Sequence, residues 1–174
     1  MTGVIFLCGI ANSGKSKVAH LLANAIPYSC IISIDDFRNY GSDHIDEEDM
    51  DEEDKEQIAI DNFLLFSKNR LSAQRYSRII IDNSWVDLEL ILTLIELIKQ
   101  HSGSFAFISV LPCNDLEQHS RGQWERKTMK ALIKQEQEFK TSKIVFKGAL
   151  ELKNVNTIKN EEVKSIINSL TFNR

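Results

Sequence analysis

Residues 9–16 of this chain read G-I-A-N-S-G-K-S, a complete match to the pattern G-x-x-x-x-G-K-[ST]. In loops with this pattern the glycines let consecutive backbone N–H groups turn inward around an anion. The lysine, here Lys15, reaches the β- and γ-phosphates of a nucleotide, and the Ser16 hydroxyl is placed to ligate Mg²⁺. The stretch therefore predicts a phosphate-binding P-loop, the Walker A motif. The residues predicted to bind the nucleotide are Gly9, Asn12, Ser13, Gly14, Lys15, Ser16 and Lys17.

The sequence on both sides of this loop has the pattern that a P-loop requires. Residues 4–8 form a continuous apolar run, which is typical of a buried parallel strand. After the loop, Val18 and Leu22 recur at helical spacing, and Pro27 ends the helix. A strand, a loop and a helix in this order direct a helix N-terminus at the phosphates, which favours a P-loop over a Gly/Ser turn without a ligand. We expect Lys15 to lie at the surface, where its removal would leave stability nearly unchanged.

The composition indicates one domain spanning residues 1–174, with 43% hydrophobic and 26% charged residues. The sequence has no apolar run of membrane-spanning length and no basic segment at its start, so we expect neither a transmembrane helix nor a signal peptide. Cys8, Cys30 and Cys113 have no paired spacing and are expected to be reduced core residues. A cytoplasmic location with no membrane partner is the resulting expectation.

Further apolar runs alternate with helical patterns along the chain. Strands are expected at residues 30–34, 78–81, 105–111 and 143–146, with helices around residues 60–64, 87–95, 123–139 and 161–170. The alternation predicts an α/β single-domain P-loop NTPase fold, with a parallel sheet of about five strands flanked by helices. Ligands of such sheets bind beyond the carboxyl ends of the strands, where the P-loop, Asp35-Asp36 and Asp82 are all expected.

Sequence features near these strand ends favour one class of P-loop protein. The chain has no guanine-reading N-K-x-D element, and Asp82 is followed by Asn83 rather than by the glutamate of ATPase motors. A kinase needs a carboxylate that accepts the proton of the acceptor hydroxyl, together with cations around the transferred phosphoryl group. Residues 34–38 read I-D-D-F-R and supply two carboxylates and an arginine directly after the second strand. These features predict a kinase.

The order of these motifs resembles the polynucleotide-kinase-like group of P-loop kinases, which includes the kinase domain of phage polynucleotide kinase and zeta-toxin-like kinases. The resemblance covers roughly residues 3–140 and is most specific at residues 9–16 and 35–38. It implies an ATP- and Mg²⁺-dependent phosphotransferase with an alcohol group as acceptor.

The resemblance also implies roles for individual residues. Asp35 matches the general base that acts on the attacking hydroxyl, and Arg38 matches a residue that grips an acceptor phosphate. Asp82 matches the acidic residue that closes the third strand near the metal and the acceptor, and Arg121 resembles the lid arginine that clamps the transferring phosphoryl group. The implied catalytic residues are Asp35, Arg121 and Lys15, the acceptor-binding residues are Arg38, Asp36 and Asp82, and the Mg²⁺ ligands are Ser16 and Asp82.

Several of these residues have a second interpretation. Asp36 is equally suited to cap the segment that follows it. Trp85 and Trp124 could stack an acceptor base or pack in the core or at its rim. A basic helix face could track phosphates or be simply solvated. This face consists of Arg126, Lys127, Lys130 and Lys134.

The formal net charge of −4 conceals an acidic segment at residues 43–54, which begins at Asp43, ends at Asp54 and holds nine acidic side chains in twelve. We expect it on the acceptor side of the site, where it would repel a polyanion within a Debye length of about 8–10 Å. It therefore favours a small-molecule acceptor over a long nucleic acid, although a solvated loop, a flap and a selectivity gate remain open. A 5′-hydroxyl polynucleotide kinase, a toxin-type sugar-nucleotide kinase and a non-catalytic ATP-binding regulatory module are the alternative functions.

Overall fold

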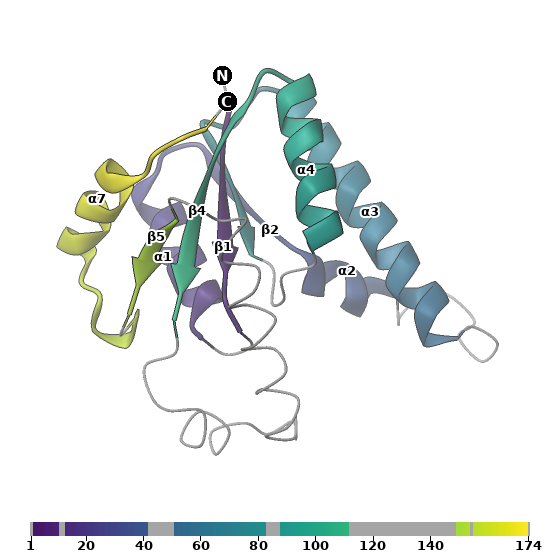
Figure 1. Cartoon of the computed structure of the whole chain (residues 1–174), viewed down its shortest axis with the longest axis horizontal. Coiled ribbons are helices and arrows are strands. Elements are labelled where there is room, and N and C mark those ends of the chain that lie inside the picture. Colours follow the sequence, from purple (N-terminus) through teal and green to yellow (C-terminus); the bar gives the residue numbers. More distant parts are fainter. Residues whose placement is uncertain are drawn as a thin grey trace, which may run out of the picture.

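A parallel β-sheet forms the centre of the computed structural model, which describes residues 2–10, 13–41, 51–82, 88–111, 149–153 and 155–173. Its strands within these residues are β1 (Gly3–Cys8), β2 (Ser29–Ser33), β3 (Arg78–Asp82), β4 (Ser104–Val110) and β5 (Leu150–Leu152). They lie in the order β2-β3-β1-β4-β5, and each neighbouring pair is parallel (Figure 1). The prediction of an α/β fold with a parallel sheet of about five strands is confirmed.

Helices cover both faces of this sheet. In the described part of the chain they are α1 (Lys15–Ala25), α2 (Ile34–Gly41), α3 (Glu52–Ser72), α4 (Leu88–Gln100) and α7 (Asn160–Ser169), with a short 3-10 turn, η2 (Val155–Thr157). Figure 1 shows α3 and α4 on one face and α1 and α7 on the other. Two hydrophobic clusters, one on each side of the sheet, correspond to these two helical layers.

The central strand β1 is apolar throughout because both of its faces are buried. Val4 and Phe6 belong to the cluster beneath α3 and α4, whereas Ile5 and Leu7 belong to the cluster beneath α1 and α7. Successive side chains of a strand point to opposite faces of its sheet, so a strand covered on both sides needs apolar residues at every position. The resulting core holds the loop after β1 on a rigid base.

The carboxyl ends of β1, β2 and β3 meet at one edge of the sheet. Asp82, the last residue of β3, is paired in register with Leu7 of β1 and with Ser33 of β2. The P-loop that follows β1 and the helix α2 that follows β2 therefore start beside Asp82. This edge is where the sequence predicted the functional residues.

Aromatic side chains hold α2 against α3. The ring of Phe37 on α2 packs edge-on against Phe63 and Phe66 of α3, with centroid distances of 5.8 and 5.6 Å. Arg70 also packs on Phe66, its guanidinium carbon 4.4 Å from the centre of the ring. Aromatic pairs of this geometry contribute about 0.5–1.5 kcal/mol beyond the area that they bury. They position the start of α2 at the carboxyl edge of the sheet.

The end of the acidic segment has a structural role at the start of α3. The Asp51 carboxylate accepts a hydrogen bond from the backbone N–H of Asp54 at 2.9 Å and so caps the helix. Glu52, Glu53 and Asp54 occupy the first turn, where negative charge interacts favourably with the helix dipole. Four of the acidic residues are therefore explained by helix initiation, and residues 42–50 lie outside the described residues.

The structure differs from the sequence expectations at two strands. Ile34 was expected to end the second strand but begins α2, where it is buried, and an apolar residue suits either position. The fifth described strand is β5, which the sequence did not indicate because it is three residues long and contains Glu151. The strand expected at residues 143–146 and the helix expected at residues 123–139 lie outside the described residues.

Among the helices that the structure describes, none combines the length and the hydrophobicity that a membrane span requires.

Candidate active site

The two glycines of the P-loop motif each have a geometric reason. A side-chain carbon at Gly9 would lie 2.3 Å from the backbone oxygen of Val110 in β4, a distance that real side chains do not reach. Gly14 precedes α1 with a φ of 97°, in the left-handed region that glycine adopts without strain. The close approach of β4 and the sharp entry into the helix therefore require glycine at these two positions.

Lys15 is the first residue of α1, and its side chain reaches back across the loop. Its Nζ donates a hydrogen bond of 2.6 Å to the backbone oxygen of Ile10, and the residue is only 4% exposed. The expectation that Lys15 lies at the surface is therefore wrong, because its side chain folds back to the Ile10 carbonyl and is buried. The Oγ of Ser13, in the same loop, is buried and has no hydrogen-bond partner among the described residues.

Asp82 brings the end of β3 into contact with the P-loop. Its carboxylate accepts a hydrogen bond from the Ser16 hydroxyl, and it interacts electrostatically with Lys15 and Asp35. Burial raises the pKa of Asp82, whereas the hydrogen bond from Ser16 and the charge of Lys15 oppose that rise. Four of the predicted site residues, from α1, α2 and β3, therefore belong to one electrostatic cluster.

Arg38 connects Asp35 to α3 through an ion-pair network. Its Nη1 donates to Asp35 Oδ1 at 2.9 Å, while its Nε donates to Glu56 Oε2 at 2.8 Å and its Nη2 donates to Glu56 Oε1. The hydrogen bonds from Arg38 to Glu56 raise the pKa of the arginine, and burial opposes them. No sequence pattern indicated Glu56, which is 18 residues from Arg38 and belongs to another helix.

The other predicted site residues separate into two groups. Asp36 lies exposed in the first turn of α2, a position that agrees with its alternative role at a helix start, and Lys17 is exposed on α1. Asn12 and Arg121 lie outside the described residues. Trp85, Trp124 and the basic helix face of residues 126–134 lie outside them as well.

Two oxygen-bearing side chains form a candidate magnesium site. No group of three or more metal-binding His, Cys, Asp or Glu side chains occurs in the described ranges. The adjacent carboxylate of Asp82 and hydroxyl of Ser16 nevertheless suit Mg²⁺, which in nucleotide sites is bound by one or two protein oxygens together with water and phosphate oxygens. The residues present therefore fit a phosphate-bound magnesium ion.

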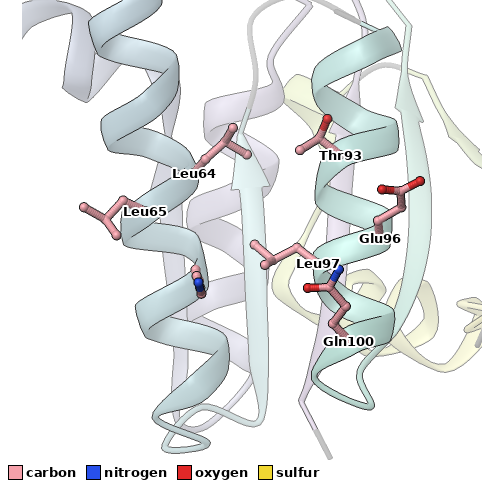
Figure 2. Close-up of a pocket in the computed structure, with 7 residues that line it drawn as sticks. Leu64, Leu65, Thr93, Glu96, Leu97 and Gln100 are labelled. Atoms are coloured by element: carbon pink, nitrogen blue, oxygen red, sulfur yellow. The ribbon is translucent and has the colours of Figure 1, made fainter.

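A separate shallow groove of about 290 Å³ lies between α3 and α4. Figure 2 shows Leu64 and Leu97 directed toward one another across it, with Glu96 and Gln100 along α4. None of the residues that line it belongs to the predicted site. The groove is therefore distinct from the cluster at the carboxyl edge of the sheet.

Comparison with known proteins identifies the fold. No protein-family model matches the chain, and no curated protein matches it at a significant level. Its structure is similar to the tunicamycin resistance protein of Deinococcus radiodurans, with a TM-score of 0.64 and 16% identity, covering 100% of this chain and 99% of that one. It is also similar to a gluconokinase from Sinorhizobium meliloti 1021, with a TM-score of 0.58 and 16% identity over 96% of this chain and 90% of that one.

A third similar structure is a chain of the Pnkp1/Rnl/Hen1 RNA repair complex, with a TM-score of 0.59 and 18% identity. The match covers 83% of this chain and 46% of that chain. At identities this low the likeness shows the fold alone. The chain therefore has the fold of P-loop kinases, and the narrower resemblance to phage polynucleotide kinase stays a prediction.

Proposed function

We propose that this protein is an ATP·Mg²⁺-dependent kinase that transfers the γ-phosphate to a hydroxyl group of a small-molecule acceptor. The observation that carries the proposal is the cluster at the carboxyl edge of the sheet. There the P-loop residues Lys15 and Ser16 meet the buried carboxylate of Asp82, and Asp35 interacts with the same carboxylate from α2. The proposed nucleotide site and the proposed general base are therefore adjacent.

The P-loop supplies the nucleotide-binding part of this proposal. Gly9 and Gly14 allow the backbone to enclose a phosphate, and the unpartnered Ser13 hydroxyl is a buried donor that a phosphate oxygen would satisfy. Ser16 and Asp82 would hold magnesium, which when bound neutralises charge on the β- and γ-phosphate oxygens. Lys15 provides a further positive charge to those phosphates. Asn12 and Lys17 complete the proposed nucleotide set.

Asp35 is the proposed general base. It is the second residue of α2, two residues after the end of β2, and its side chain is half exposed, so an acceptor hydroxyl can approach it. The ion pair with Arg38 restricts the orientation of its carboxylate. In this position Asp35 would accept the proton of the acceptor hydroxyl as that oxygen attacks the γ-phosphorus. Arg121 is the proposed lid cation, on the strength of the sequence resemblance.

The charges around Asp35 support an acceptor without its own phosphate. Asp36, Glu56 and Asp82 add negative charge near this residue, and Arg38 is the basic side chain paired with it. These negative charges close to the proposed base repel an acceptor that carries its own negative charge. A 5′-hydroxyl polynucleotide kinase remains the alternative, because one similar structure is part of an RNA repair complex.

The test is a phosphorylation screen with ATP and Mg²⁺ over a mixture of alcohols, sugars and nucleosides, scored by the mass gain of one phosphate. The Asp35→Asn variant is the matched control, since it removes the proposed base and retains the P-loop. A product formed by the intact protein and lost in Asp35→Asn supports the proposal. Calorimetric ATP binding with no product from any hydroxyl compound would instead indicate a regulatory ATP-binding module.

A parallel assay with 5′-hydroxyl oligonucleotides and radiolabelled ATP addresses the acceptor. We expect no efficient labelling by the intact protein. Efficient labelling would favour polynucleotide kinase. Labelling that arises only after the acidic residues 43–54 are neutralised would identify that segment as a selectivity gate.

A further inference from the structure

Arg38 binds the carboxylate of Glu56 on α3 with the geometry that an arginine uses to bind a phosphate. The two carboxylate oxygens of Glu56 accept hydrogen bonds from Nε and Nη2 of the same guanidinium group. This two-bond fork is the geometry that makes arginine suitable for planar carboxylates and for phosphates. The edge of Arg38 that could hold an acceptor phosphate is therefore occupied by a protein carboxylate.

The remaining nitrogen of the guanidinium group is directed to the proposed base. Arg38 Nη1 donates to Asp35 Oδ1 at 2.9 Å, three residues earlier on α2. All three guanidinium nitrogens therefore donate to carboxylates of the protein. A phosphate on the acceptor could form the two-bond fork with Nε and Nη2 of Arg38 only by displacing Glu56.

Neighbouring packing keeps Glu56 opposite Arg38. Phe37, adjacent to Arg38 in sequence, is held by the rings of Phe63 and Phe66 of α3, which fixes α2 against α3. Glu56 is itself half-buried and lies one helical turn before Ala59, which is buried. Because the helices are held together by apolar contacts, Glu56 can remain opposite Arg38 without the ion pair having to hold them.

We propose that Glu56 is a specificity-determining residue, which occupies Arg38 and thereby excludes acceptors that carry a phosphate next to the reacting hydroxyl. The proposal rests on the proposed function, because it assigns the acceptor side of the same site. It narrows the acceptor to a neutral or cationic alcohol. It also makes Arg38 a residue that orients Asp35 rather than one that grips the acceptor.

The experiment follows the NMR resonance of the Arg38 guanidinium carbon during titration with inorganic phosphate, in the presence of saturating ADP and Mg²⁺. The resonance is assigned by its absence in Arg38→Lys. The test variant is Glu56→Gln, which retains the length of the side chain and removes its charge. Glu53→Gln is the matched control, because it removes the same charge from an exposed position on α3. Glu56→Asp retains the charge.

We expect the phosphate concentration at the midpoint to be roughly 10- to 100-fold lower in Glu56→Gln than in the intact protein, the factor that charge-assisted hydrogen bonds contribute. Glu53→Gln and Glu56→Asp should titrate like the intact protein. Equal midpoints for the intact protein and Glu56→Gln, or no response in Glu56→Gln, would each overturn the proposal. Should Glu56→Gln not fold, Glu56→Ala also removes the carboxylate and must show the same gain.

This titration requires no phosphoryl transfer, so it separates the two proposals. Failure of the phosphorylation screen with a gain of phosphate binding in Glu56→Gln would reject the kinase and retain the role of Glu56. Turnover of an alcohol with unchanged phosphate binding would retain the kinase and reject the role of Glu56. The ADP is the same in all variants, so a P-loop effect cannot produce a difference between Glu56→Gln and Glu53→Gln.

Discussion

The hydroxyl of Ser16 donates a hydrogen bond to the carboxylate of Asp82, and this bond joins the first turn of α1 to the end of β3. Asp82 is only 6% exposed, so its charge is maintained at a cost in desolvation. We therefore expect this buried carboxylate to lower the stability of the ligand-free protein and to contribute instead to the binding of a cation. This relationship leads to the first prediction.

Asp82→Asn should raise the melting temperature of the ligand-free protein at neutral pH. Burial raises the pKa of Asp82 above its ordinary value of 3.8, so the folded protein holds this proton more tightly than the unfolded chain. Ionisation of Asp82 therefore lowers the free energy of unfolding as pH rises from 3.8 to the raised pKa, and the full penalty remains above that value. Thermal unfolding measured at several pH values should show that the gain in melting temperature of Asp82→Asn over the intact protein disappears in acid.

The same variant should lose the stabilisation that ATP·Mg²⁺ confers on the intact protein, because the proposed metal ligand is absent. Asparagine retains an acceptor for the Ser16 hydroxyl, so the local geometry is preserved. A lower melting temperature for Asp82→Asn at neutral pH would show that the charge stabilises the fold through Lys15 instead.

Lys15→Ala should weaken ATP·Mg²⁺ binding by at least about tenfold, since a charge-assisted hydrogen bond to phosphate is lost. The variant also removes the donor to the Ile10 carbonyl, so we expect a loss of about 1–3 kcal/mol in the free energy of unfolding. Calorimetry and chemical denaturation measure the two effects. Lys99→Ala, an exposed lysine at the end of α4, is the control. Unchanged ATP affinity in Lys15→Ala would make the loop a purely structural turn.

Asp35→Asn should lower kcat by about 10²–10⁴ and leave ATP affinity unchanged, as expected for the loss of a general base. Arg38 retains its two hydrogen bonds to Glu56 in this variant, so α2 should stay in place. Asp36→Asn is the matched comparison and should have a much smaller effect, because Asp36 is exposed in the first turn of α2. A larger loss at Asp36 than at Asp35 would mean that the base is the second carboxylate.

Gly9→Ala should destabilise the protein more than Gly14→Ala does. The added carbon at Gly9 would clash with the Val110 backbone, which cannot move without displacing β4, and overpacking of this kind costs about 1–3 kcal/mol or more. At Gly14 the added carbon meets Val155 at an ordinary 3.4 Å, so the cost is the left-handed backbone, about 1–2 kcal/mol. Urea denaturation gives both values, and the reverse order would contradict the described loop.

Arg121→Ala should lower kcat by about 10³–10⁵, the range for an arginine that stabilises a transferring phosphoryl group. Arg121→Lys should also be impaired, because an ammonium lacks the planar fork of a guanidinium group. Steady-state kinetics on the acceptor found in the screen supply the measurement. Near-normal turnover of Arg121→Ala would move the role to another cation, with Arg126 as the next candidate.

Local sequence patterns predicted the parts of the candidate site that depend on residues adjacent in sequence. The G-x-x-x-x-G-K-S pattern placed the loop between a strand and a helix, and the polar residues after the apolar runs placed Asp35 and Asp82 at strand ends. The burial of Lys15 could not be predicted in this way, because it depends on the side chain folding back to the Ile10 carbonyl. β5 was missed because a short edge strand with a central glutamate has almost no periodic signal.

The sequence by itself determined that this chain forms a parallel α/β sheet with a P-loop motif after its first strand. Apolar runs that fill both faces of a strand, and glycines at fixed spacing, act within a few residues and can be read in order along the chain. Only the tertiary structure decided which carboxylate meets which cation. Ser16 with Asp82 and Arg38 with Glu56 are brought together by sheet register and by the packing of Phe37 on α3, and pairings between distant segments leave no periodic trace in the sequence.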